Sequence, residues 1–73
     1  MSRLPVILPD RLVRALRSIG FEIERQKGSH AHLRHKDGRR TIVPMHPVPL
    51  KKGTLTGILR DTYLTSDQLR GLL

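Results

Sequence analysis

Two glycine-containing turns constrain the fold of this chain more than any other feature. Lys27-Gly28-Ser29 precedes the short segment His30–His35, and Asp37-Gly38 follows it. An Asp-Gly pair between two extended segments is a strong signal for a two-residue hairpin loop. The sequence therefore predicts three consecutive strands, over residues 21–26, 30–35 and 39–43. In the first of them, apolar and polar residues alternate over positions 21–24, as in a half-buried strand.

The Asp37-Gly38 turn also predicts how the second and third strands pair. With these two residues as the loop, Lys36 faces Arg39 and the rest of the register follows by counting. The predicted pairs are Leu33 with Ile42, Ala31 with Pro44, His32 with Val43 and Arg34 with Thr41. Residues directly opposite one another share a face of the sheet. The apolar partners then fall together, and the face that carries the histidines is predicted to be open.

Helical periodicity flanks the three strands on both sides. The first predicted helix covers residues 9–19 and opens on a proline, with Leu12, Val13, Leu16 and Ile19 on its apolar face and Gly20 at its end. The second begins at residues 51–54 and has Leu55, Ile58, Leu59 and Thr62 on one face. Thr65-Ser66-Asp67-Gln68 fits the capping box of a short last helix. The predicted fold class is α+β, as one small domain over residues 1–73.

The charge of the chain favours a polyanionic partner. Fourteen Lys and Arg residues stand against 6 Asp and Glu, a formal net charge of +8. Nucleic acid, an anionic membrane surface and an acidic protein are the partners that such an excess attracts. No apolar run approaches the ~20 residues that a membrane-spanning helix needs, so we expect a cytoplasmic protein without a membrane partner. The absence of cysteine excludes disulfides and thiolate-bound zinc.

The second predicted strand carries most of the available chemistry. His30, His32 and Arg34 alternate with apolar residues, so the ionisable side chains share one face of the strand. Histidine takes and gives protons near neutral pH, since its unperturbed pKa is roughly 6.5. Lys27 and Arg34 are cations that can hold an anion beside it. This combination suits phosphodiester chemistry.

Several motifs in the same order resemble those of the HicA toxins. They are Gly20-Phe21, Gln26-Lys27-Gly28-Ser29-His30, the Asp37-Gly38 hairpin, Val43-Pro44-Met45-His46, and Lys52-Gly53-Thr54-Leu55 followed by Ile58-Leu59-Arg60. The resemblance runs from Leu12 to Arg60. It implies a fold similar to a double-stranded-RNA-binding domain, with a three-stranded antiparallel sheet backed by two helices. One departure is that HicA proteins commonly end the second helix with a glycine, whereas this chain continues Asp61-Thr62-Tyr63.

The resemblance also implies an activity. HicA toxins are small ribonucleases that cut mRNA and arrest translation, and a HicB antitoxin holds each of them inactive. Their catalytic histidine lies in Gly-Ser-His, which is His30 here. We expect it to act without metal or cofactor, as base on the ribose 2'-hydroxyl or as acid on the leaving oxygen; the second proton-transfer group is unassigned. The residues predicted to bind RNA are Lys27, Gly28, Ser29, Arg34, Lys51 and Lys52.

Three other interpretations remain open at the level of sequence. A non-catalytic module that binds double-stranded RNA accounts equally well for the fold and the charge, because such RNA is recognised largely by shape and backbone contacts. A zinc site would need His30 and His32 with His46 as a third ligand, but no carboxylate or thiolate lies in these motifs. His46 either closes the site from its loop or is structural. The basic surface can also serve an acidic partner protein.

Overall fold

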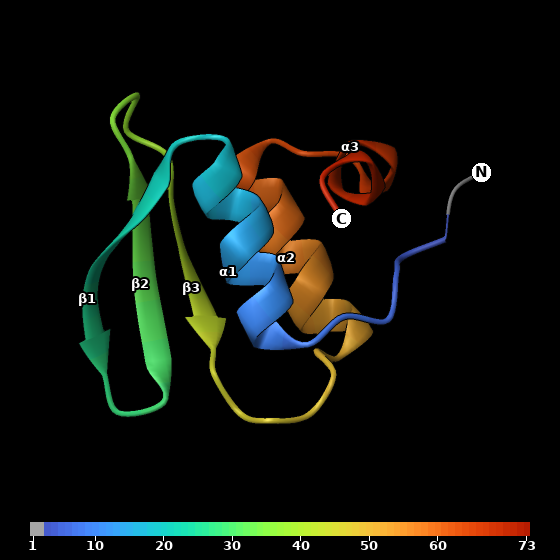
Figure 1. Cartoon of the computed structure of the whole chain (residues 1–73), viewed down its shortest axis with the longest axis horizontal. Helices are drawn as coiled ribbons and strands as arrows, with labels where there is room; N and C mark the ends of the chain where they lie inside the picture. Colours follow the sequence, from blue (N-terminus) through green and yellow to red (C-terminus); the bar gives the residue numbers. More distant parts are fainter. Residues whose placement is uncertain (1–2) are drawn as a thin grey trace.

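The computed structural model describes residues 3–73 and has the predicted α+β fold. Along the chain the elements are α1 (Pro9–Ser18), β1 (Phe21–Lys27), β2 (His30–His35), β3 (Arg40–Pro44), α2 (Lys52–Thr62) and α3 (Ser66–Gly71). The strands form one antiparallel sheet in the order β1-β2-β3 (Figure 1). A three-stranded antiparallel sheet with helices before and after it confirms the predicted architecture.

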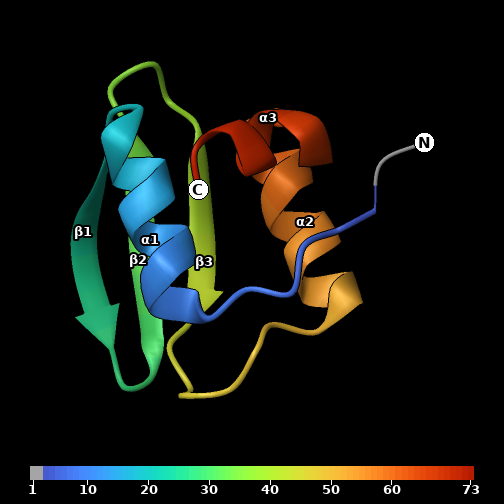
Figure 2. The same ribbon diagram turned by 45° about the vertical axis from the view of Figure 1, so that its right-hand side comes forward.

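The core lies between the sheet and the helices. Figures 1 and 2 show α1 against one face of the sheet and α2 next to it, beside β3. The fully buried large side chains come from all of these elements and from α3: Phe21, Leu12, Leu16, Leu33, Leu55, Leu69, Val43 and Thr62. Among the described residues, no helix covers the other face of the sheet. We call this other face the open face.

The β2–β3 hairpin differs by one residue from the predicted register. Its loop has three residues, Lys36 to Gly38, because the N–H of His35 donates to the carbonyl oxygen of Arg39 at 2.8 Å. Gly38 has a φ of +102°, as the last residue of a three-residue loop with a left-handed position requires. The observed pairs are His30 with Pro44, Ala31 with Val43, His32 with Ile42, Leu33 with Thr41 and Arg34 with Arg40.

The observed register changes which β3 residues lie beside the histidines of β2. Val43 and Thr41 are buried with Ala31 and Leu33 on the core face, whereas Ile42, predicted to face the core, is 48% exposed beside His32. The four predicted cross-strand pairs are therefore wrong. The prediction that the histidine face is open is confirmed. The one-residue shift exchanges the faces of the β3 side chains but leaves those of the β2 side chains unchanged.

β1 departs from simple alternation at a bulge. Ile23 pairs with Leu33, and Arg25 pairs with His32, so Glu24 is an extra residue between them. A bulge leaves one residue unpaired and increases the local twist. The result is that Arg25 lies on the open face beside His32.

α2 ends in a backbone conformation that glycine usually supplies. Tyr63 has a φ of +57°, and the N–H groups of Tyr63 and Leu64 donate to the carbonyl oxygens of Arg60 and Leu59. This pair of bonds is the Schellman pattern, in which the left-handed position is most often glycine. The chain ends the helix there without the glycine, and Tyr63 remains 80% exposed.

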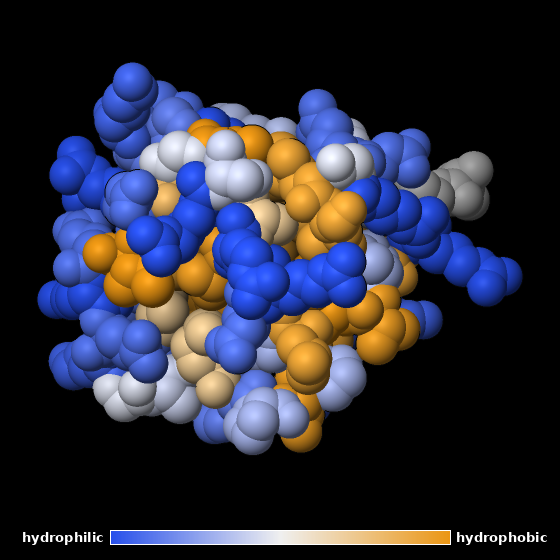
Figure 3. All heavy atoms as spheres, viewed as in Figure 1, coloured by the Kyte–Doolittle hydropathy of each residue, from blue (hydrophilic) through white to orange (hydrophobic). Residues whose placement is uncertain are grey.

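The predicted capping box fixes the start of α3. The backbone N–H of Gln68 donates to the Thr65 hydroxyl at 3.1 Å, and the N–H of Thr65 donates to the Gln68 side chain at 2.8 Å. Leu69 is fully buried in the core. On the helix-bearing face, hydrophobic and hydrophilic residues are interspersed (Figure 3). None of the helices in residues 3–73 is long and apolar enough to cross a membrane.

Candidate active site

His30 lies beside the tight turn between β1 and β2. Lys27 and His30 are cross-strand partners, so Gly28 and Ser29 form a two-residue loop between them. Gly28 has a φ of +59°, which glycine adopts at little steric cost. Opposite residues share a face, so the Lys27 ammonium and the exposed His30 imidazole both stand on the open face. The structure therefore brings these two predicted site residues together.

The connection between β3 and α2 meets this turn. The N–H of Met45 donates to the carbonyl oxygen of Ser29 at 2.6 Å, and Pro44 is the β3 partner of His30. Figure 1 shows the β1–β2 turn, this connection and the start of α2 at the same end of the molecule. A small hollow of about 230 Å³ in this region is lined by both His46 and Lys51.

The first turn of α2 offers unpaired donors at this end. No side chain caps the helix at Lys51, and no acidic residue lies in its first turn. The first N–H groups of a helix have no partner within it, and they favour anions together with the helix dipole. Lys51 and Lys52 are exposed. Basic residues oppose the dipole here, so they suit a site that receives an external anion.

Arg34 is separated from His30 along β2. Four residues of a strand span about 13 Å, although both side chains lie on the open face. Arg34 pairs with Glu22 on one side and with Arg40 on the other. The structure therefore separates Arg34 from the pair formed by Lys27 and His30.

His35 has a structural role. Its Nε2 is 3.0 Å from the carbonyl oxygen of Ile19, its Nδ1 accepts the N–H of Asp37 at 3.1 Å, and its ring packs edge-on against Phe21 at 5.1 Å. The side chain is 13% exposed. By contrast, no hydrogen bond within residues 3–73 involves the imidazole of His30, His32 or His46. These three rings are available for binding or proton transfer.

Arg39 and Asp37 complete the network around His35. Hydrogen bonds from the Arg39 N–H, at 3.0 Å, and from its Nε, at 2.9 Å, lower the pKa of Asp37 below its usual value, the backbone donor having the larger effect. The guanidinium also lies 5.0 Å from the centre of the Phe21 ring and donates to the carbonyl oxygen of Thr62 at 2.5 Å. The hairpin is thereby tied to the end of α2.

A comparison with protein families gives a match over most of the chain. The family described as "HicA toxin of bacterial toxin-antitoxin" matches residues 9–64. The chain belongs to the HicA toxin family. Its role is therefore that of a toxin in a toxin–antitoxin system. The HicA match runs from the start of α1 to just beyond the end of α2 and includes every predicted site residue. A comparison with curated proteins gives no match.

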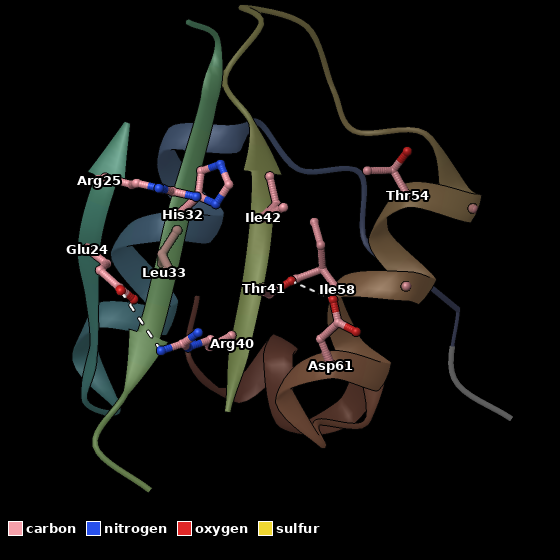
Figure 4. A pocket seen from close by; sticks show the side chains of 12 residues that line it. Glu24, Arg25, His32, Leu33, Arg40, Thr41, Ile42, Thr54, Ile58 and Asp61 are labelled. Carbon is pink, nitrogen blue, oxygen red and sulfur yellow. Dashed lines mark hydrogen bonds and ion pairs between the residues drawn. The ribbon is translucent and has the colours of Figure 1, made fainter. Parts of the chain in front are cut away.

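The HicA fold also forms a groove that the sequence did not predict. It has a volume of about 580 Å³ and lies between the open face and α2, where His32, Arg25 and Ile42 face Gly57 and Asp61 (Figure 4). His30 is outside this groove, next to it along β2. Residues so far apart in the sequence are brought together by the packing of α2 beside β3, and no local motif signals that packing.

The described part of the chain contains no cluster of metal-binding side chains. Within residues 3–73, no group of three or more His, Cys, Asp or Glu side chains is placed to hold a metal ion. The zinc set considered from the sequence, His30 and His32 with His46, is not such a group. Beside His30 lie the Lys27 ammonium and the backbone amides of the Gly28-Ser29 turn.

Proposed function

We propose that this HicA-family toxin is an endoribonuclease that cuts mRNA in the cytoplasm without a metal or cofactor. The observation that carries the proposal is the position of His30. Its imidazole is exposed, has no internal hydrogen bond, and stands beside Lys27 on the open face of a strongly basic chain. A histidine in this state can exchange protons with a bound substrate.

The proposed reaction uses the ribose 2'-hydroxyl as nucleophile. His30 removes the proton from this hydroxyl, which attacks the adjacent phosphorus, or it protonates the 5'-oxygen that leaves. Lys27 and the amides of Gly28 and Ser29 stabilise the negative charge on the phosphate oxygens. The mechanism requires the 2'-hydroxyl, so the enzyme should cut RNA and leave DNA intact.

The remaining cations bind the rest of the RNA strand. Arg34 contacts a phosphate further along β2, and Lys51 and Lys52 contact one at the start of α2. Because these side chains are exposed, an acidic protein can bind the same surface. We propose that a HicB-type antitoxin inhibits the toxin by covering this surface and excluding RNA.

A direct test compares wild type with His30→Ala in EDTA, on a labelled single-stranded RNA and its DNA counterpart. We expect wild type to cut only the RNA, and His30→Ala to bind the RNA without cutting it. Circular dichroism checks that the variant is folded. Cleavage by His30→Ala would exclude this residue as the catalyst. RNA that wild type binds and leaves intact would favour the alternative, a non-catalytic RNA-binding module.

A further inference from the structure

The groove between the open face and α2 has the features of a nucleobase site. Its volume of about 580 Å³ falls within the 300–1,000 Å³ typical of small-molecule pockets. Figure 4 shows Arg25 and His32 side by side, and Ile42 on the neighbouring strand. Bases of single-stranded RNA stack on the rings of histidine and on the planes of arginine guanidinium groups. The groove supplies both surfaces, although the only Phe is buried and the only Tyr lies elsewhere.

The charges of the groove suit a neutral ring better than a phosphate. Two arginines, Arg25 and Arg40, are balanced by two carboxylates, Glu24 and Asp61, whereas the whole chain has a net charge of +8. Glu24 lies 4.0 Å from Arg40 as an ion pair. The charged side chains offer donors and acceptors to the edge of a base. The apolar side chains of the groove suit the face of its ring.

Asp61 gives the groove an acceptor for the edge of a base. Its Oδ2 accepts the hydroxyl of the buried Thr41 at 2.9 Å. This bond fixes the carboxylate beside the groove and leaves Oδ1 free to accept a further hydrogen bond. A carboxylate accepts hydrogen bonds and donates none when it is ionised. It therefore favours bases with an exocyclic amino group, which adenine, cytosine and guanine have. Uracil has one N–H donor on its pairing edge, but this donor lies between two carbonyl oxygens that repel a carboxylate.

The position of the groove connects it with the proposed cleavage site. His30 and His32 are on the same face of β2 and two residues apart, which is about 7 Å along a strand. We infer that the groove binds the base next to the phosphate held at His30, and that it sets the sequence preference of cleavage. This inference rests on the proposed ribonuclease function.

Gly57 provides a way to fill the groove without disturbing the fold. It lies within α2 and lines the groove, and a Cβ built on it meets no atom within 4 Å. Leucine also favours helix more than glycine does. Gly57→Leu should therefore fold and occupy the space for the base. Thr56→Leu is the matched control, because Thr56 is the exposed neighbour in α2 and does not line the groove.

The first measurement is affinity for a short single-stranded RNA that contains all four bases. Both substitutions are made in His30→Ala, so that the RNA stays intact, and thermal unfolding checks each fold. Stacking of one base contributes enough for Gly57→Leu to weaken binding about fivefold or more. Thr56→Leu should stay within about twofold of its parent. Equal affinities for the two variants would overturn the inference.

The second measurement maps cleavage sites in a randomised RNA pool with His30 intact. We expect wild type and Thr56→Leu to share a preference for amino-bearing bases at one position, which Gly57→Leu and Asp61→Asn should lose. An unchanged preference would show that the groove does not read the base. If Gly57→Leu instead weakens only antitoxin binding, the groove is a protein site and the inference is wrong. If wild type cuts no RNA but Gly57→Leu still weakens binding, the ribonuclease proposal fails and the base site remains.

Discussion

Burial and hydrogen bonding distinguish one of the four histidines of this chain from the others. His30 and His35 begin and end the same strand, yet only His35 has its ring enclosed and hydrogen-bonded. Gly20 allows this enclosure, because a Cβ at that position would lie 2.8 Å from the Nε2 of His35. The ring of His30 faces solvent. The sequence placed both residues on one strand but could not reveal these surroundings.

The role assigned to His35 predicts a loss of stability on its removal. His35→Ala deletes an edge contact with Phe21 and leaves the carbonyl of Ile19 and the N–H of Asp37 without this partner. We expect the free energy of unfolding to fall by about 2–3 kcal/mol. Denaturation by urea measures the change. His32→Ala is the control and should change the value by less than about 0.5 kcal/mol; equal losses would contradict the structural role.

At the scale of elements, the sequence predicted the helices and strands well and one register badly. Strand β2 matches its predicted bounds, and the capping box of α3 is present. The Asp37-Gly38 pair, however, fits both a two-residue loop and the last two positions of a three-residue loop. The prediction assumed the two-residue loop, and the resulting pair of Leu33 with Ile42 was consistent with it. In the observed three-residue loop, Arg39 contacts Phe21 and the end of α2. These contacts join residues that are distant in the sequence.

The end of α2 predicts a stabilising substitution. Tyr63 holds a left-handed conformation that costs a non-glycine residue roughly 1–2 kcal/mol, and its side chain is 80% exposed. Tyr63→Gly relieves this cost, although glycine also loses more entropy on folding. We expect the free energy of unfolding to rise by about 1 kcal/mol and the melting temperature to increase.

The matched control is Tyr63→Ala, which removes the same exposed side chain but keeps a Cβ in the left-handed position. It should be no more stable than wild type. If both variants melt at the same temperature, the backbone conformation of Tyr63 has no cost that glycine relieves. Such a result would also mean that the glycine missing from the end of α2 has no consequence for stability.

At the scale of the molecule, the local part of the candidate site was predictable and the distant part was not. Lys27 and His30 meet because a short turn joins them, and a sequence motif reports such a turn directly. The contact of the turn with the β3–α2 connection, through Ser29 and Met45, depends on the path of the whole chain. The same holds for the groove beside α2. The proximity of Lys27 and His30 was therefore predictable from the sequence, whereas the surface that surrounds them required the fold.

The distribution of charge over the whole molecule predicts how salt affects RNA binding. Each phosphate contact on single-stranded nucleic acid contributes about 0.7 to the slope of log affinity against log salt concentration. In a His30→Ala background, replacing Lys51 and Lys52 with alanine should reduce this slope by about 1.4 if each contacts one phosphate. Arg11 and Arg14 are exposed residues of α1, and this helix packs against the face of the sheet opposite the open face (Figure 1). Their double alanine variant removes the same charge and should leave the slope unchanged. Equal reductions would mean that RNA responds to the total charge of +8 and not to the positions of the individual cations.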